Sequence, residues 1–116
     1  MTEPVLSKLS PDLLEHLASA AVDNPVEVIL ELQPLTMPNG TRQERVAALR
    51  EAFDREVRPI VQLVEEAHGR IVERAWINQT ARAVIPAGAI PAVASEASVA
   101  RIDLPDFVHP DVKRTA

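Results

Sequence analysis

The sequence of 116 residues predicts an α+β fold, in which a four-stranded antiparallel sheet carries two helices on one face and an extra helix precedes it. Three observations predict this class. Apolar and charged side chains alternate along residues 26–32, which indicates a strand. Residues 41–69 repeat apolar side chains at spacings of three and four, which indicates a long amphipathic helix. Three more short β-type runs lie within residues 70–85 and 99–104.

The first helix is predicted to begin at Ser10, whose hydroxyl can cap it and which precedes a proline at the first helical position. It should end before Pro25, because the residue preceding a proline is disfavoured in helical conformation. The strand at residues 26–32 follows, with Val26, Val28, Leu30 and Leu32 on one side. Ile29 lies on the other side, between two glutamates.

The long helix is predicted to begin with a capping box, in which Thr41 and Glu44 each satisfy a backbone amide of the other. Pro59 lies in its interior and lacks a backbone donor, so we expect a kink or a split near residues 55–59. Gly69 is the predicted C-cap, because glycine adopts the left-handed conformation at low cost.

The second half of the chain contains shorter elements. We predict strands at residues 70–77 and 80–85, joined by a corner at residues 78–79, then a short helix within residues 87–97 and a last strand at residues 99–104. Strand, helix, strand therefore occurs twice. This order predicts a ferredoxin-like βαββαβ arrangement with both helices on one face of the sheet.

Composition limits the classes of function. Hydrophobic residues make up 47% of the chain, so we expect one packed domain. The net charge of −5 argues against nonspecific binding of nucleic acid, and the absence of cysteine excludes disulfides and thiolate chemistry. The three histidines, His16, His68 and His109, are dispersed, so we expect no enzyme, no metal site and no cofactor. No signal peptide or membrane-spanning run is visible, so we expect a cytoplasmic protein.

The segment "GRIVERAWINQTARAVIPAGAIPAVASEASVARIDLP" resembles the second half of subtilase propeptides and of the related small protease inhibitors. In that family a hairpin follows the long helix, proline often leads into the second helix, and a Val-x-x-Val/Ile-acid strand closes the sheet. Val99, Ile102 and Asp103 match that last pattern here. The resemblance covers roughly residues 26–112. The domain boundaries we expect are an N-terminal extension at 1–25, the inhibitor-like domain at 26–104 and an extended tail at 105–116.

The resemblance implies a mechanism and a partner. The open face of the sheet would pack on a subtilisin-like or other serine protease, while the tail runs through the substrate cleft. Such domains inhibit the enzyme and, as propeptides, act as folding chaperones. Many propeptides place an acid near the hairpin to cap a protease helix, whereas this chain has Asn78 there. Pro105 and Pro110 in the tail lack the backbone amide that strand addition uses.

Candidate binding residues lie on the open sheet face and in the tail. Trp76 is the predicted anchor, because tryptophan and arginine are enriched at binding hot spots. The residues predicted beside it are Arg74, Arg82, Val84 and Ile29, with Asn78 at the corner. The alternative is that Trp76 fills a gap beneath a helix or under the N-terminal segment. The candidates in the tail are Phe107, Val108, His109, Asp111 and Val112; the alternative there is an untethered chain end.

A second hypothesis is an assembly or regulatory domain of ferredoxin-like fold. Such a domain would pair with itself as a homodimer, or with another protein, through its sheet, and would have no protease target. Unrelated proteins share this fold, so the fold alone does not choose between the two hypotheses. A small enzyme is a third class, but the sequence contains no catalytic set of residues to support it.

Overall fold

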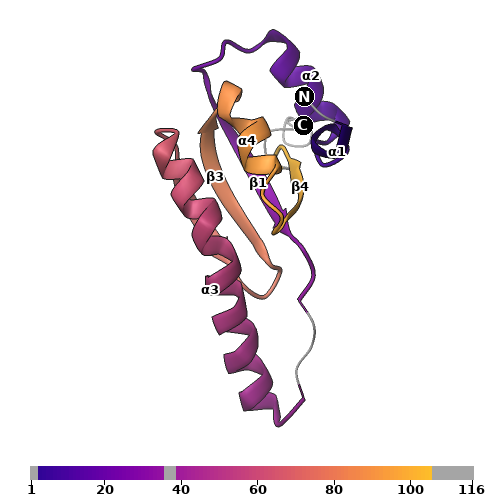
Figure 1. The fold of residues 1–116 in the computed structure, drawn as a ribbon, viewed down its shortest axis with the longest axis vertical. Helices are drawn as coiled ribbons and strands as arrows, with labels where there is room; N and C mark the ends of the chain where they lie inside the picture. Colours follow the sequence, from indigo (N-terminus) through magenta and orange to yellow (C-terminus); the bar gives the residue numbers. More distant parts are fainter. Residues whose placement is uncertain (1–2, 36–38, 106–116) are drawn as a thin grey trace, which may run out of the picture.

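The computed structural model describes residues 3–35 and 39–105, and Figure 1 shows their arrangement. In chain order the elements are α1 (Glu3–Leu6), α2 (Pro11–Ser19), β1 (Pro25–Leu32), α3 (Arg42–Glu66), β2 (Arg70–Ala75), β3 (Thr80–Pro86), the 3-10 turn η1 (Ala87–Ala89), α4 (Ile90–Ala94) and β4 (Val99–Asp103). The four strands form one sheet in the order β2-β3-β1-β4. Neighbouring strands are all antiparallel, which confirms the predicted fold class.

The strand order shows two interleaved strand–helix–strand units. In the first unit, β1-α3-β2, the two strands lie on either side of β3. In the second unit, β3-α4-β4, the two strands lie on either side of β1, so β1 and β3 are the central strands of the sheet. Helices α3 and α4 lie on the same side of the sheet (Figure 1). They differ greatly in length, since α3 has 25 residues and α4 only 5. The N-terminal end of α3 extends past the β2–β3 hairpin in Figure 1.

The core lies between the sheet and the helices. β1 alternates as the sequence predicts: Val26, Val28, Leu30 and Leu32 are buried, whereas the residues between them are not. The helix α3 contributes Phe53, Val57, Ile60 and Val64, spaced at intervals of three and four. The strand β3 adds Ala81, Ala83 and Ile85. The side of the sheet that faces the helices is therefore packed with aliphatic side chains.

Local interactions define the ends of α3. The predicted capping box is present: the amide of Glu44 donates to Thr41 Oγ1 at 3.1 Å, and the amide of Thr41 donates to Glu44 Oε1 at 2.8 Å. The helix continues through Pro59, so the predicted split is wrong. Val57 and Ile60, on either side of the proline, are almost fully buried and hold this segment on the sheet.

The C-terminal end of α3 also differs from the prediction. Ala67 is the C-cap, and His68, with φ 70°, takes the left-handed position expected for glycine. The amide of Gly69 donates to Val64 O at 2.8 Å, which completes the hydrogen-bond pattern of a Schellman motif. Gly69 is needed for a different reason: a Cβ atom there would collide with the backbone oxygen of Val84.

The N-terminal segment packs along β4 instead of standing apart from the domain. Leu9 forms a parallel bridge with Ile102, and both Leu9 and Leu13 are buried in the core. The amide of Ser10 donates to Ile102 O at 3.0 Å, and the amide of Ile102 donates to Lys8 O at 2.8 Å. Ser10 also caps α2, as predicted. The outer edge of β4 is therefore covered by the segment that precedes α2.

Candidate protein-docking face

One face of the sheet has no buried residue within the described chain. We call it the open face; its members are Glu27, Ile29, Glu31, Arg70, Glu73, Ala75, Thr80, Arg82, Val84, Arg101 and Asp103. Each of these residues is half-buried or exposed. The N-terminal segment bonds to the edge of β4 and leaves this face accessible. The prediction of an uncovered sheet face agrees with this arrangement.

Arg82 occupies the middle of the open face and connects three strands. Its Nε lies 3.2 Å from Glu27 Oε2 on β1, and its Nη2 lies 3.3 Å from Glu73 Oε1 on β2. The exposed fractions of the three side chains are 29% for Arg82, 34% for Glu27 and 61% for Glu73. Ion pairs that remain accessible to solvent add little to folding stability. Their effect here is to hold charged groups of both signs at fixed positions on the face.

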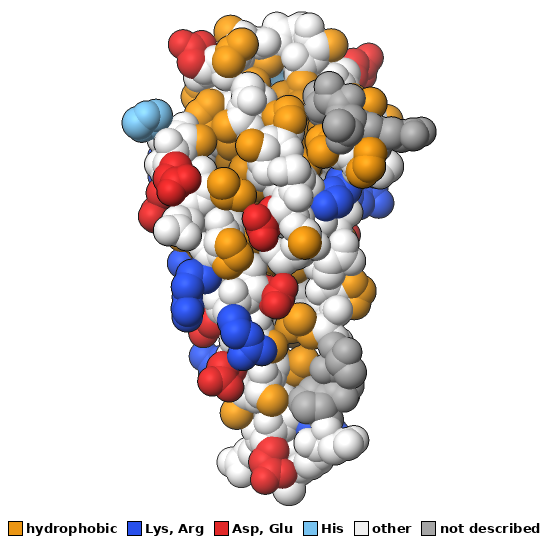
Figure 2. Space-filling view, viewed as in Figure 1, with side chains coloured by type: hydrophobic (Ala, Val, Ile, Leu, Met, Phe, Trp, Pro, Cys, Tyr) orange, Lys and Arg blue, Asp and Glu red, His pale blue; other side chains and the backbone are white. Residues whose placement is uncertain are grey.

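Apolar side chains lie among these charges. Ile29 is the register partner of Arg82, and Val84 is the register partner of Glu27, and both apolar residues are half-buried. Towards β4, Arg101 Nη2 lies 3.8 Å from Asp103 Oδ2. The opposite, helix-covered side of the molecule also mixes charges of both signs along α3 (Figure 2). Charge alone therefore does not distinguish the two sides; the open face is distinguished by being a sheet surface without helices.

Three of the predicted face residues lie where the sequence analysis puts them. Arg82, Val84 and Ile29 all belong to the open face. Arg74 does not, because its register partner is Ala81, which is buried on the helix side. Arg74 lines a small hollow together with Asp54 and Arg58 of α3. The predicted position of Arg74 on the open face is wrong.

Trp76 also lies on the helix side. The guanidinium carbon of Arg50, on α3, is 5.3 Å from the centre of the Trp76 ring, which is a cation–π geometry. The ring is half-buried and packs against the core. The reason is a β-bulge between Ile71 and Glu73, which reverses the alternation of side chains along β2. The alternative interpretation, in which Trp76 fills a gap beneath a helix, agrees with the structure.

The corner between β2 and β3 presents two residues to solvent. Ile77 is 76% exposed, and Asn78 beside it is also exposed. Gln79 holds the corner in place, because its Oε1 accepts from the amide of Leu35 at 3.3 Å and its backbone oxygen accepts from the amide of Leu32 at 2.9 Å. Asn78 is among the residues predicted from the sequence, whereas Ile77 is not. An isoleucine inside a tight hairpin corner, where no core lies, is the signal that could have found it.

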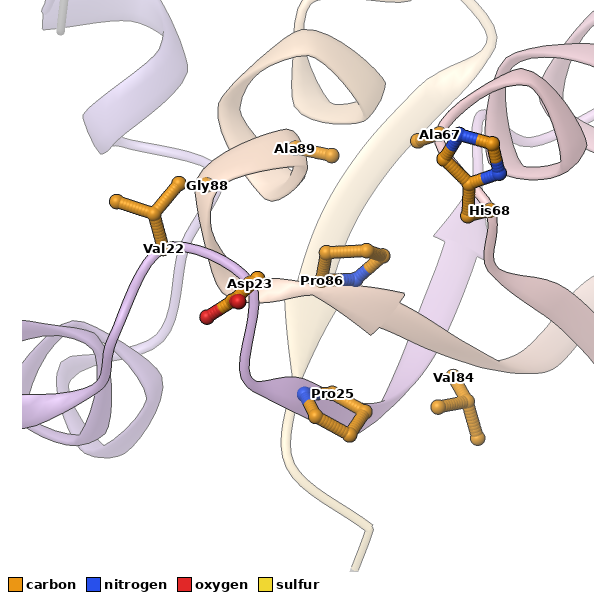
Figure 3. A pocket seen from close by; sticks show the side chains of 9 residues that line it. All are labelled: Val22, Asp23, Pro25, Ala67, His68, Val84, Pro86, Gly88 and Ala89. Atoms are coloured by element: carbon orange, nitrogen blue, oxygen red, sulfur yellow. The ribbon is translucent and has the colours of Figure 1, made fainter.

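A larger hollow lies at the opposite end of the sheet, where β1 begins and β3 ends (Figure 3). Its volume is about 570 Å³. The lining is mostly apolar and consists of Val22, Asp23, Pro25, Ala67, His68, Val84, Pro86, Gly88 and Ala89. In residues 3–35 and 39–105 there is no group of histidines and acids that could hold a metal ion. The hollow is therefore lined mainly by apolar side chains and has no set of metal ligands among the described residues.

The candidate residues of the tail, Phe107, Val108, His109, Asp111 and Val112, lie outside the described residues. Within the described residues, no helix has the length and apolar character needed to cross a membrane. No protein-family model, no curated protein and no solved structure matches the chain. The resemblance to subtilase propeptides therefore stays a prediction.

Proposed function

We propose that this chain is a protein-binding module that inhibits a subtilisin-like serine protease, assists its folding, or does both. The open face docks on the enzyme, and the segment after β4 enters the substrate cleft. The observation that carries the proposal is the two-sided sheet. Helices α3 and α4 cover one side, whereas every residue of the other side is half-buried or exposed. A sheet surface of this kind is suited to packing against a partner.

The arrangement of side chains on the open face favours a protein partner. Ile29 and Val84 supply apolar contact area next to Arg82, which is held by ion pairs to β1 and β2. Groups that are already fixed lose little conformational entropy on binding. Charges of both signs at fixed positions also select a partner of complementary pattern. Arg74 and Trp76 are not part of the proposed contact surface, because they face α3.

The hairpin corner extends the proposed surface. Ile77 and Asn78 are exposed on a turn that Gln79 fixes to the chain after β1. The side-chain oxygen of Asn78 can accept a hydrogen bond from the first amides of a partner helix, which have no partner within that helix. Ile77 would add apolar contact beside it. Both residues are therefore included in the proposed interface.

The chain after β4 is the segment that enters the substrate cleft in this proposal. The strand ends at Asp103, and Leu104 lies close to Pro25 at the start of β1. Eleven residues follow Pro105 in the sequence. A fully extended segment of that length spans about 36 Å. In this proposal the residues that contact the cleft are Phe107, Val108, His109, Asp111 and Val112.

Titration of the chain into a subtilisin-like protease tests the proposal, with hydrolysis of a chromogenic peptide as the readout. We expect stoichiometric inhibition, and we expect deletion of residues 107–116 to abolish it. Ile29→Lys should weaken inhibition at least about tenfold, because it places a charge in an apolar contact. Gln62→Lys adds the same charge on an exposed position of α3 and is the matched control. Rapid digestion of the chain without inhibition would contradict the inhibitor role, and a stable dimer would then favour the assembly domain.

A further inference from the structure

The two edges of the sheet differ in a way that points to a second interaction surface. The outer edge of β4 is covered by the segment around Leu9, which bonds to Ile102. β2 forms the other edge, and no residue of 3–35 or 39–105 pairs with its outer side. An unpaired edge presents backbone donors and acceptors that a further strand can use. The edge of β2 is therefore available for strand addition.

The sequence of β2 is complementary to itself when two copies run antiparallel. Its first four residues are Arg70, Ile71, Val72 and Glu73. With the two-fold axis between Ile71 and Val72, Arg70 lies opposite Glu73 of the partner subunit. In the same register Ile71 lies opposite Val72 of the partner subunit. Opposite charges and aliphatic pairs directly across two antiparallel strands both stabilise the pairing.

In this register, the two residues of each charge pair lie on the same face of the sheet. Arg70 pairs with Val84 within the chain and Glu73 pairs with Arg82, so both charged residues belong to the open face. Ile71 pairs with Ala83 on the helix side, and Val72 is the residue at the bulge. The two charge pairs would consequently lie on one surface of the joined sheet. Ile71 lies towards the other surface.

The exposure of Val72 supports a partner at this edge. Its exposed fraction is 44%, so an aliphatic side chain is exposed at the unpaired edge. Arg70 and Glu73 are exposed on either side of the aliphatic pair. We propose that two copies of this chain associate through their β2 edges and form one antiparallel sheet of eight strands. The proposal does not depend on a protease partner.

The association is expected to be weak and to leave the docking face free. Four residues from each copy give an interface smaller than that of a standard stable complex, so the dimer should form at high protein concentration. A two-fold axis perpendicular to the sheet places both open faces on the same side. Each copy therefore keeps its open face accessible.

Sedimentation equilibrium from about 5 μM to about 1 mM protein tests the proposal. We expect the wild-type chain to become dimeric within this range. Arg70→Glu places two acids opposite each other in both charge pairs, and Glu73→Arg places two arginines there. Each variant should weaken the dimer about tenfold, because attraction becomes repulsion at two positions. Val72→Lys should weaken it as well, by placing a charge in the aliphatic pair.

Charge reversal supplies the controls. An equal mixture of Arg70→Glu and Glu73→Arg should form a heterodimer of wild-type affinity, and the double variant should form a homodimer of the same affinity. Arg101→Glu changes an exposed charge near the opposite edge and should leave association unchanged. Thermal melting of each variant shows that the fold is intact.

Two outcomes would overturn the proposal. The first is a wild-type chain that stays monomeric at about 1 mM. The second is a dimer that is insensitive to both charge reversals, because such a dimer uses another surface.

Discussion

Leu13 of α2 connects the N-terminal segment to the core, and its truncation to alanine measures how firmly that segment is held. The side chain is fully buried and belongs to the same core as the residues of β1 and α3. The helix is capped by Ser10, which also bonds to β4. Loss of the Leu13 contact would therefore loosen the cover on the outer edge of β4.

The expected loss follows from the atoms removed. Leu13→Ala deletes three carbon atoms, which corresponds to about 2.4 kcal/mol of transfer free energy at about 0.8 kcal/mol per methylene. The cavity left behind adds to this, because neighbouring core residues relax only in part. We expect a total loss of about 3 kcal/mol in the free energy of unfolding. A chain of 116 residues has a stability of about 6 to 17 kcal/mol, so the variant should still fold.

Chemical denaturation monitored by circular dichroism gives the free energy of unfolding, and a thermal scan gives the melting temperature. A loss of about 3 kcal/mol corresponds to a decrease of about 12 °C for a chain of this length. Leu17→Ala makes the same change at a half-buried position of α2 and should cost at most about half as much. A loss below about 1 kcal/mol for Leu13→Ala would refute the reasoning, because the N-terminal segment would then not be part of the packed core in solution.

Three further substitutions test other contacts. Trp76→Ala should reduce the free energy of unfolding by about 2 kcal/mol, because the ring is half-buried against the core. An unchanged melting temperature for this variant would contradict the position of the ring on the helix side. Arg50→Ala should change the tryptophan fluorescence, because Arg50 contacts the ring. Gly69→Ala should reduce the free energy of unfolding by about 1 to 3 kcal/mol, because the new Cβ atom would collide with the backbone oxygen of Val84. Denaturant titration measures this loss, and an unchanged free energy of unfolding would refute the contact. Pro59→Ala should raise the melting temperature, since it restores a helical backbone donor; a decrease would show that the ring itself packs favourably.

Much of the fold could be predicted from the sequence, because local patterns and tertiary packing agree. The alternation in β1 and the spacing of apolar residues in α3 both mark the surfaces that form the core. The capping box at Thr41 is a purely local signal and is present as predicted. The position of the open face followed from the same alternation. Ile29, Val84 and Arg82 were therefore placed correctly.

Other features depend on contacts between distant parts of the chain. The bridge between Leu9 and Ile102 joins residues that are far apart in sequence, and nothing in the first nine residues indicates it. The conformations at the end of α3 show the same limit. Glycine is the usual choice for a left-handed residue, yet here His68 adopts that conformation and Gly69 is required by close packing against β3. Packing overrides the local preference at this point.

The bulge in β2 decides which residues reach which surface. If alternation were unbroken from Arg70, both Arg74 and Trp76 would share its side of the sheet and lie on the open face. The extra residue at Val72 reverses the alternation, so that Glu73 faces Arg82 and Arg74 faces the helices. The same insertion leaves Val72 outside the ladder with β3, at the unpaired edge. The pairing of Glu73 with Arg82 and the exposure of Val72 at the free edge therefore have one structural cause.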